Sequence, residues 1–200
     1  MKKSKCQRLL RLAIAAFFLF LIFYPALGIT QDTYTGYMGL YPQVADDGRL
    51  LWQGSDGSDY EIYSQEPGQA ATQLTYNAVD DCMPQMNATG DVVWMSMTVG
   101  DSDIYYDSGF GPIRLTNNDG YYDAMPQIAA NGDIYWQGWD GTDYEIYRYD
   151  RNTFVTTQLT DNTVNDTNPQ VNANGDVVWM QFFGMDYDIC VNGVLITNNN

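Results

Sequence analysis

The chain of 200 residues contains no histidine and few cationic residues. Without imidazole, histidine base catalysis, histidine-ligated metal centres and a serine–histidine–aspartate triad are excluded. Five of the nine Lys and Arg residues lie before residue 12, which leaves four arginines against all 25 acidic residues. Because phosphate recognition depends on Lys and Arg, nucleic acids and anionic lipid surfaces are poor partners, whereas cations or basic proteins suit this charge. The four arginines are Arg49, Arg114, Arg148 and Arg151, too scattered for a sialidase-like site.

Cysteine is also scarce. Beyond the N-terminal segment the chain has only Cys82 and Cys190, which occupy unrelated positions in the repeats described below. An exported compartment permits a disulfide, but nothing in the spacing of these residues predicts one.

The N-terminal segment has one long apolar run, Leu12–Tyr24, which follows five basic residues. The run is too short to span a bilayer comfortably, and the small-residue sequence Ala26-Leu27-Gly28 follows it. This pattern predicts a signal peptide over residues 1–28, cleaved after Gly28, and therefore a periplasmic or secreted protein. The alternative is a protein anchored in the membrane through an uncleaved N-terminal segment.

The rest of the chain is a tandem array of four similar segments. Each opens with Pro-Gln and continues with a glycine-containing turn and a short apolar run that contains Trp. The turn supplies the positive φ of a tight strand connection, and the run is too short for a helix. A period near 42 residues in a β-rich unit is typical of four-stranded propeller blades. The repeated tryptophans are Trp52, Trp94, Trp136 and Trp179, at intervals of 42, 42 and 43 residues.

Each segment has two further motifs. The first, Asp-x-Glu/Asp-Ile, alternates apolar and polar positions as a strand with one buried side does. The second is a closing strand that ends in Leu-Thr or Ile-Thr. We therefore expect four strands in each segment. The expected organisation is a lead-in segment at residues 29–41 and a propeller domain at 42–200, with blades at about 42–83, 84–125, 126–168 and 169–200.

These motifs resemble the WD-repeat-like blades of TolB-type β-propellers. The resemblance rests on Leu-Thr, the glycine turn, an Ile-Tyr pair, and an Asp three residues before Pro (Asp81, Asp123 and Asp166). It covers residues 42–197 and implies an all-β fold, a β-propeller-like array of four four-stranded antiparallel blades. The array is a closed four-blade ring, a half ring completed by dimerisation, or an open array.

The resemblance implies no single activity, because these blades serve periplasmic adaptors, peptidase propeller domains and sugar-processing lyases. Lyases of this kind are expected to use histidine-bound metal, which this chain does not provide. Calcium is a separate possibility, since Asp56-Gly-Ser-Asp59 and Asp140-Gly-Thr-Asp143 offer oxygen ligands, although the full spacing of a calcium loop is missing. The candidate metal ligands are therefore Asp56, Asp59, Asp140 and Asp143, and no other cofactor is expected.

Strand parity predicts which loops share a face. In an up-and-down blade, the connections between blades emerge on the same side as the loops between second and third strands. Several of these loops carry apolar residues among carboxylates, which indicates either a binding face or a packed cap on the blades. The candidate partner-binding residues are Met97, Tyr121, Tyr122, Trp139, Phe182 and Phe183.

The repeated residues also have structural interpretations. We expect the four tryptophans to fill the core between blades. Asp81, Asp123 and Asp166 are expected to accept hydrogen bonds from backbone amides where each blade begins. The many carboxylates also have a simple explanation, since they keep the edges of an exported β protein charged.

We predict an exported, non-enzymatic β-propeller module that binds or scaffolds protein partners at the cell envelope, with a basic partner and a homodimer as candidate assemblies. The alternative is a secreted calcium- or carbohydrate-binding module. A carboxylate-based glycosidase is a third hypothesis, disfavoured because no carboxylate pair stands apart from the repeat.

Overall fold

The computed structural model describes residues 39–118 and 120–198. Its contacts divide the chain after Asp32 into two units. The predicted signal peptide lies outside the described residues, and everything below concerns the second unit. Within the described ranges, no helix has the length and apolar character needed to cross a membrane.

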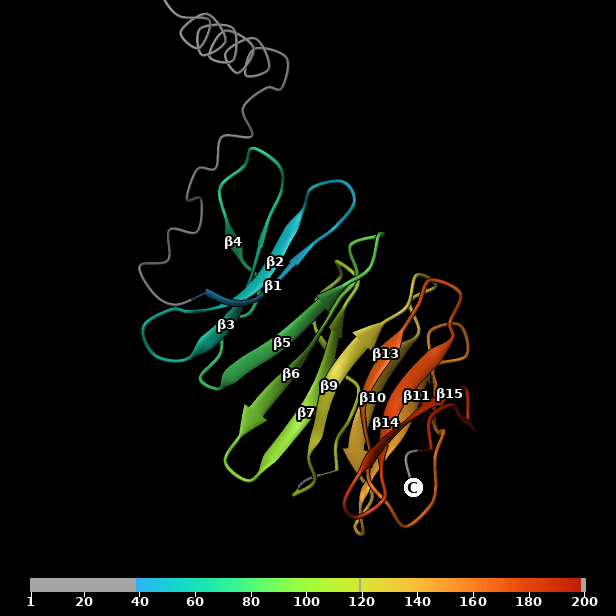
Figure 1. Cartoon of the computed structure of the whole chain (residues 1–200). Helices are drawn as coiled ribbons and strands as arrows, with labels where there is room; N and C mark the ends of the chain where they lie inside the picture. The colour runs from blue at the N-terminus through green and yellow to red at the C-terminus, as the bar shows by residue number, and fades with distance from the viewer. Residues whose placement is uncertain (1–38, 119, 199–200) are drawn as a thin grey trace, which may run out of the picture. The chain divides into compact units, whose positions relative to one another are not determined.

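Sixteen strands form four antiparallel sheets in the described part of the chain, and in each sheet the strands lie side by side in sequence order. The prediction of four four-stranded antiparallel sheets is therefore confirmed (Figure 1). The first sheet comprises β1 (Gly39–Val44), β2 (Leu50–Ser55), β3 (Tyr60–Gln65) and β4 (Thr72–Gln73); the second β5 (Asp80–Met86), β6 (Val92–Thr98), β7 (Asp101–Asp107) and β8 (Ile113–Arg114); the third β9 (Asp123–Ile128), β10 (Ile134–Trp139), β11 (Tyr144–Asp150) and β12 (Val155–Gln158); the fourth β13 (Asp166–Val171), β14 (Val177–Phe182), β15 (Tyr187–Val191) and β16 (Val194–Leu195).

The first strand of each sheet contains a bulge at the repeated proline. The register shifts there in all four sheets, for example between Cys82 and Gln85. Proline has no N–H to donate to the ladder, so the strand bulges at this point instead of stopping. The residue before each proline has a positive φ of 50–55°: Tyr41, Met83, Met125 and Asn168. The first strands begin three or four residues before the prolines that mark the expected blade starts.

Two of these bulges donate a hydrogen bond to the preceding sheet. The side-chain oxygen of Gln53 accepts from the backbone N–H of Met83 at 3.0 Å. Gln137 accepts from the N–H of Asn168 in the same way at 2.8 Å. Each glutamine follows the Trp of its own strand, so the Trp-Gln pair links one sheet to the next.

The core lies between consecutive sheets. Trp94 packs with Leu51 and Ile62 of the preceding sheet, and Trp136 and Trp179 occupy the equivalent places in the next two interfaces. All four repeated tryptophans are buried, which confirms their predicted role as core residues. Three of them stack on a tyrosine of the neighbouring strand, with ring centroids 5.7–5.9 Å apart: Trp52 on Tyr63, Trp94 on Tyr105, and Trp136 on Tyr147.

The first strands of successive sheets pack on one another, β1 on β5, β5 on β9 and β9 on β13. No packing of similar extent joins the first and fourth sheets in the described residues. Cys82 in β5 and Cys190 in β15 are both buried and free.

Candidate functional site

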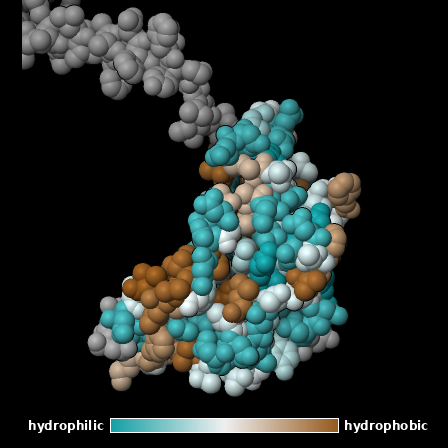
Figure 2. Space-filling model, turned by 90° about the vertical axis from the view of Figure 1, so that its right-hand side faces the viewer, coloured by the Kyte–Doolittle hydropathy of each residue, from teal (hydrophilic) through white to brown (hydrophobic). Residues whose placement is uncertain are grey.

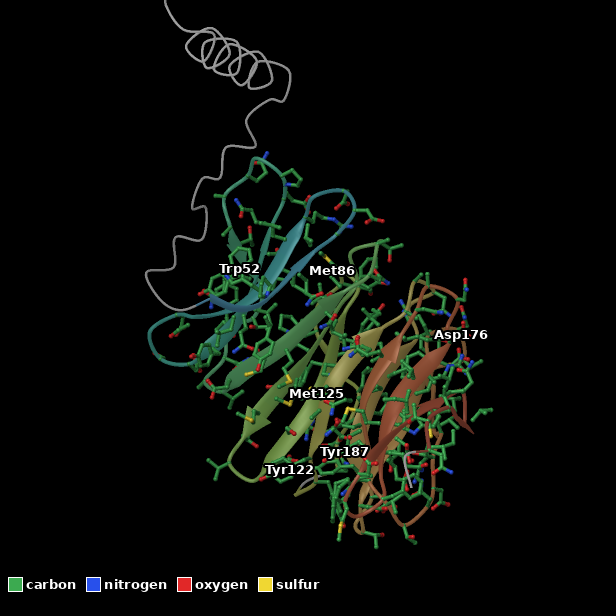
Figure 3. The ribbon with its side chains drawn as sticks, in the orientation of Figure 1. Trp52, Met86, Tyr122, Met125, Asp176 and Tyr187 are labelled. Atoms are coloured by element: carbon green, nitrogen blue, oxygen red, sulfur yellow. The ribbon has the colours of Figure 1, made fainter. Side chains whose placement is uncertain are left out.

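The connections between sheets and the loops between second and third strands lie together at one end of the sheets. The backbone shows this directly, because Trp139 N–H donates to the carbonyl of Tyr122 at 3.0 Å and Phe182 N–H donates to that of Asn165 at 2.9 Å. We call this end the connection face. It comprises residues 56–59, 99–100, 140–143 and 183–186, the connections 74–79, 115–118, 120–122 and 159–165, and the adjoining strand ends. Figure 3 shows Tyr122 and Tyr187 at this end, and Met86 and Asp176 at the opposite one.

The candidate partner-binding residues all lie on the connection face. Met97, Tyr121, Tyr122 and Phe183 are exposed. Trp139 and Phe182 are partly buried and contact neighbouring rings: Trp139 meets Tyr144 with centroids 5.3 Å apart, and Phe182 meets Tyr187 at 4.8 Å.

Sequence reasoning missed several exposed apolar residues of the same face, among them Tyr76 in the first connection. Val99 and Met185 are almost fully exposed at loop tips, and half of Tyr187 is exposed at the start of β15. Val99 and Met185 lie within loops already selected by strand parity, so the signal was present in the sequence. The exposed apolar surface of the connection face is therefore larger than predicted.

Charge is distributed unevenly between the two ends of the sheets. Arg49, Arg148 and Arg151 lie toward the end opposite the connection face. There Arg49 pairs with Asp47 at 2.7 Å, Arg148 pairs with Asp133 at 2.6 Å, and Arg151 donates to the Tyr106 hydroxyl at 2.8 Å. Arg114 lies near the connection face, with its guanidinium 2.6 Å from an oxygen of Asp103. The connection face is thus dominated by carboxylates and apolar side chains.

The Leu-Thr motif positions the buried carboxylates below this face. The Thr75 hydroxyl accepts from the backbone N–H of Ile62 and donates to the carboxylate of Glu61. Thr116 makes the same pair of bonds with Ile104 and Asp103. The closing strand thereby holds the third residue of each Asp-x-Glu/Asp-Ile motif in place.

The candidate metal ligands form two matched groups once a glutamate is added to each. Asp56 and Asp59 lie with Glu61, and Asp140 and Asp143 lie with Glu145; in each group, one carboxylate oxygen per residue lies within 4.8 Å of the others. Sequence reasoning missed both glutamates, although they are the third residue of a recognised motif.

The loop folds locally around the first aspartate of each group. Asp140 accepts from the backbone N–H of Thr142 at 2.7 Å and of Asp143 at 3.1 Å. Gly141 between them has a φ of 110°, which a residue with a Cβ rarely adopts. Asp56 makes the equivalent bonds in the first sheet. Amide donors lower the pKa of both carboxyls.

Asp143 has a different environment. Its side chain is only 6% exposed, and neither carboxylate oxygen has a hydrogen-bond partner in the described residues. Burial, and then the negative charges of Asp140, Asp166 and Asp161, raise the pKa of Asp143. Burial, and then the negative charge of Asp56, also raise the pKa of Asp59.

The aspartates that precede the repeated prolines were expected to bind backbone amides, and this expectation was wrong. Their described donors are side chains: Asn77 Nδ2 donates to Asp81 at 2.7 Å, Asn162 Nδ2 to Asp166 at 2.7 Å, and the indole Nε1 of Trp136 to Asp123 at 2.9 Å. The asparagines lie four residues before their aspartates, whereas the tryptophan comes from a neighbouring strand and is not indicated by the local sequence. Burial raises the pKa of Asp123 to about 6.

A hollow between the first and second sheets lies toward the opposite end. It has a volume of about 140 Å³, and Arg49, Gln65, Met86 and Trp94 are among the residues that line it. Pockets for drug-sized ligands usually hold roughly 300–1,000 Å³. A larger hollow of about 530 Å³ lies on the fourth sheet, with Asp176 and Val191 among its lining residues. The repeated tryptophans are themselves buried and so do not form an exposed platform for a sugar ring.

Comparison with known proteins shows the fold. Neither a scan against models of protein families nor a search of curated proteins finds a match. Solved structures do match. TolB from Acinetobacter baumannii is similar with a TM-score of 0.62 and 24% identity over 80% of this chain. A putative TolB from Agrobacterium tumefaciens has a TM-score of 0.59 and 21% identity over 75% of this chain. A puromycin-hydrolyzing peptidase from Mycobacterium tuberculosis has a TM-score of 0.62 and 14% identity over 79%.

The chain is therefore similar to the β-propeller domains of TolB, and to propellers of peptidases. It spans only 42% and 60% of the length of the two TolB chains and 28% of the peptidase. At these identities the likeness concerns the fold alone.

Proposed function

We propose that this protein is an exported, non-enzymatic binding module that binds a protein partner with a basic surface through the connection face. The observation that carries the proposal is the set of exposed apolar side chains on an acidic face. Aromatic and methionine side chains are enriched at protein interfaces, and complementary charge raises the rate of encounter. Export follows from the predicted signal peptide.

The residue types of the face support binding more than catalysis. The chain contains no histidine for proton transfer, and its carboxylates recur from one sheet to the next without one distinct pair. TolB and a peptidase both have similar folds, so the fold leaves both kinds of function open. The exposed apolar surface favours a binding role.

Cross-linking in the producing cells tests this proposal. A photoactivatable phenylalanine analogue placed at Phe183 is expected to give a covalent adduct with another protein after irradiation. Phe154 is the matched control, because it is equally aromatic and exposed but lies toward the opposite end. Adducts of equal yield at both positions, or none at Phe183, would contradict the proposal.

We also propose that a second copy of the chain covers the outer side of the fourth sheet. Val93, Met95, Ile104 and Tyr106 of the second sheet are buried against the third. In the fourth sheet the equivalent positions are only partly buried, and no further sheet follows them in the described residues: Val178, Met180, Ile189 and Val191. Figure 2 views the domain from this side and shows apolar surface gathered in a patch. A dimer formed here would extend the array toward a ring.

A further inference from the structure

We propose that the first and third sheets each bind one calcium ion on the connection face, with Asp56, Asp59 and Glu61 as ligands in one site and Asp140, Asp143 and Glu145 in the other. This inference does not depend on the proposed protein-binding function, because it rests on different residues of the same loops.

The spacing of the carboxylates fits a single ion. In each group, one oxygen per residue lies within 4.8 Å of the other two. Calcium binds oxygen at about 2.3–2.6 Å, so two oxygens on opposite sides of one ion are separated by about 4.6–5.2 Å. Calcium also accepts irregular arrangements of six to eight oxygens, which waters complete at an open loop. Three converging carboxylates are therefore enough protein ligands for a calcium site that waters complete.

The state of Asp143 points independently to a missing ligand. Its carboxylate is 94% removed from solvent, yet neither oxygen accepts a hydrogen bond in the described residues. A buried carboxylate without a partner is costly, and an ion is one of the few explanations for it. Glu145 beside it is fully buried and accepts a hydrogen bond from Asn162 N–H at 2.7 Å.

The charges around Asp143 are all of one sign. The charged groups that act on this carboxylate are Asp140, Asp166 and Asp161, which are all acidic. Arg148 and Arg151, the two arginines of the third sheet, are engaged toward the opposite end. A divalent cation supplies the positive charge that the third sheet lacks at this point.

The second sheet provides an internal comparison. There Thr98 stands in place of Asp56 and Asp140, while Asp101 and Asp103 are retained. The Arg114 guanidinium lies 2.6 Å from Asp103 and 3.9 Å from Asp101. Arg114 pairs with Tyr105 in β7, and the residues in register with it in the first and third sheets are neutral: Gln73, which pairs with Tyr63, and Gln158, which pairs with Tyr147. In the second sheet the Arg114 guanidinium thus occupies the position where we place a metal ion in the first and third sheets.

The fourth sheet departs in another way. Phe183 replaces the first aspartate, and Asp188 is held by the hydroxyl of Thr197 at 2.9 Å. Only the two groups in the first and third sheets bring three acidic side chains together in the described residues. The proposed sites therefore alternate along the array.

Calorimetric titration of the exported chain with calcium chloride, after treatment with a chelator, tests the proposal. We expect two ions bound per chain, one for each carboxylate group. Asp143→Asn and Asp59→Asn are each expected to remove one site, with an affinity loss at that site of about 100-fold or more, because losing a ligand exceeds the effect of losing its supporting contacts. Asp101→Asn is the matched control, since it changes the equivalent residue of the arginine-neutralised sheet, and it should leave both sites intact.

A thermal measurement separates loss of calcium binding from loss of folding. Calcium should raise the melting temperature of the native chain, because it binds the folded state. Asp143→Asn should melt higher than the native chain in chelator, since it removes a buried charge, and should respond less to calcium. If this variant does not fold, Asp140→Asn at an exposed position replaces it. Absence of both binding heat and a melting shift, equal binding by Asp143→Asn, or binding of magnesium chloride but not calcium chloride would overturn the proposal.

Discussion

Asp123 illustrates how single buried carboxylates act in this protein. Its side chain is 2% exposed and accepts a hydrogen bond from the Trp136 indole. Gly138 permits this contact, because a Cβ at that position would collide with the Asp123 carboxylate. The folded state therefore holds an acid whose pKa is raised to about 6 by burial. Such a group makes stability depend on pH.

The sign of that dependence follows from the shift. Between pH 4 and about 6 the folded state keeps a proton on Asp123 that the unfolded state has released, so stability falls as pH rises through this range. Above pH 6 the carboxylate is ionised in both states, and the loss, on the order of 3 kcal/mol, is complete.

We predict that Asp123→Asn reduces this pH dependence. Urea unfolding at pH 4.5 and pH 7 in chelator would measure it, and the variant should lose less stability between these values than the native chain. An asparagine oxygen still accepts from the Trp136 indole, so the fold should be kept. An unchanged difference between the two pH values would contradict the prediction.

At the scale of the strand, the Leu-Thr motif is a structural device. The closing strands of the first, second and fourth sheets pair over only two residues each. In every sheet the threonine hydroxyl accepts a backbone N–H of the third strand, which extends the pairing: Thr75 from Ile62, Thr116 from Ile104, Thr160 from Ile146, and Thr197 from Ile189. Where the closing strand ends, the threonine hydroxyl thus accepts the hydrogen bond that a backbone carbonyl of that strand would otherwise accept.

We predict that Thr116→Val lowers the free energy of unfolding by about 1–3 kcal/mol, because valine has the same shape but leaves the buried Ile104 N–H and one Asp103 oxygen without this hydroxyl. Denaturant unfolding measures the change. Thr156→Val is the control, since Thr156 is an exposed strand residue, and its effect should stay within about 0.5 kcal/mol. Equal effects of the two variants would show that the hydroxyl of Thr116 contributes nothing.

At the scale of the whole domain, the sheets form a series in which each covers the next. The first three present apolar residues that the following sheet buries, and the fourth presents the same positions only partly covered. An apolar sheet face that is only partly covered favours association, so we expect this face to determine the number of chains in the assembly in solution.

We predict that the native chain is a dimer and that Val191→Asp makes it a monomer, because the substitution places a charge on the uncovered side of the fourth sheet. Light scattering coupled to size-exclusion chromatography would measure the mass. Val155→Asp serves as the control, as Val155 is an exposed valine on β12, and it should leave the mass unchanged. A monomeric native chain would refute the proposed assembly.

The repeat was sufficient to determine the strands, their order, the buried tryptophans and which loops share the connection face. These features depend on local chemistry: a glycine turn, an apolar run of strand length, and alternation along the chain. The repeat also placed Tyr122 and Trp139 on the same face, because in an up-and-down sheet the number of strands between two loops decides whether they share an end.

Tertiary structure alone decided which side chains meet. It brought Glu145 to Asp140 and Asp143, set Arg114 against Asp103, and gave Asp123 an indole as its donor. It also left Val191 only partly buried, with no sheet over it among the described residues. The last two contacts join residues on different strands, whereas the three acidic residues are close in sequence and are brought together by the fold of their loop. The consequences of all these contacts depend on burial, which raises the cost of an unpaired charge and is absent from any local pattern.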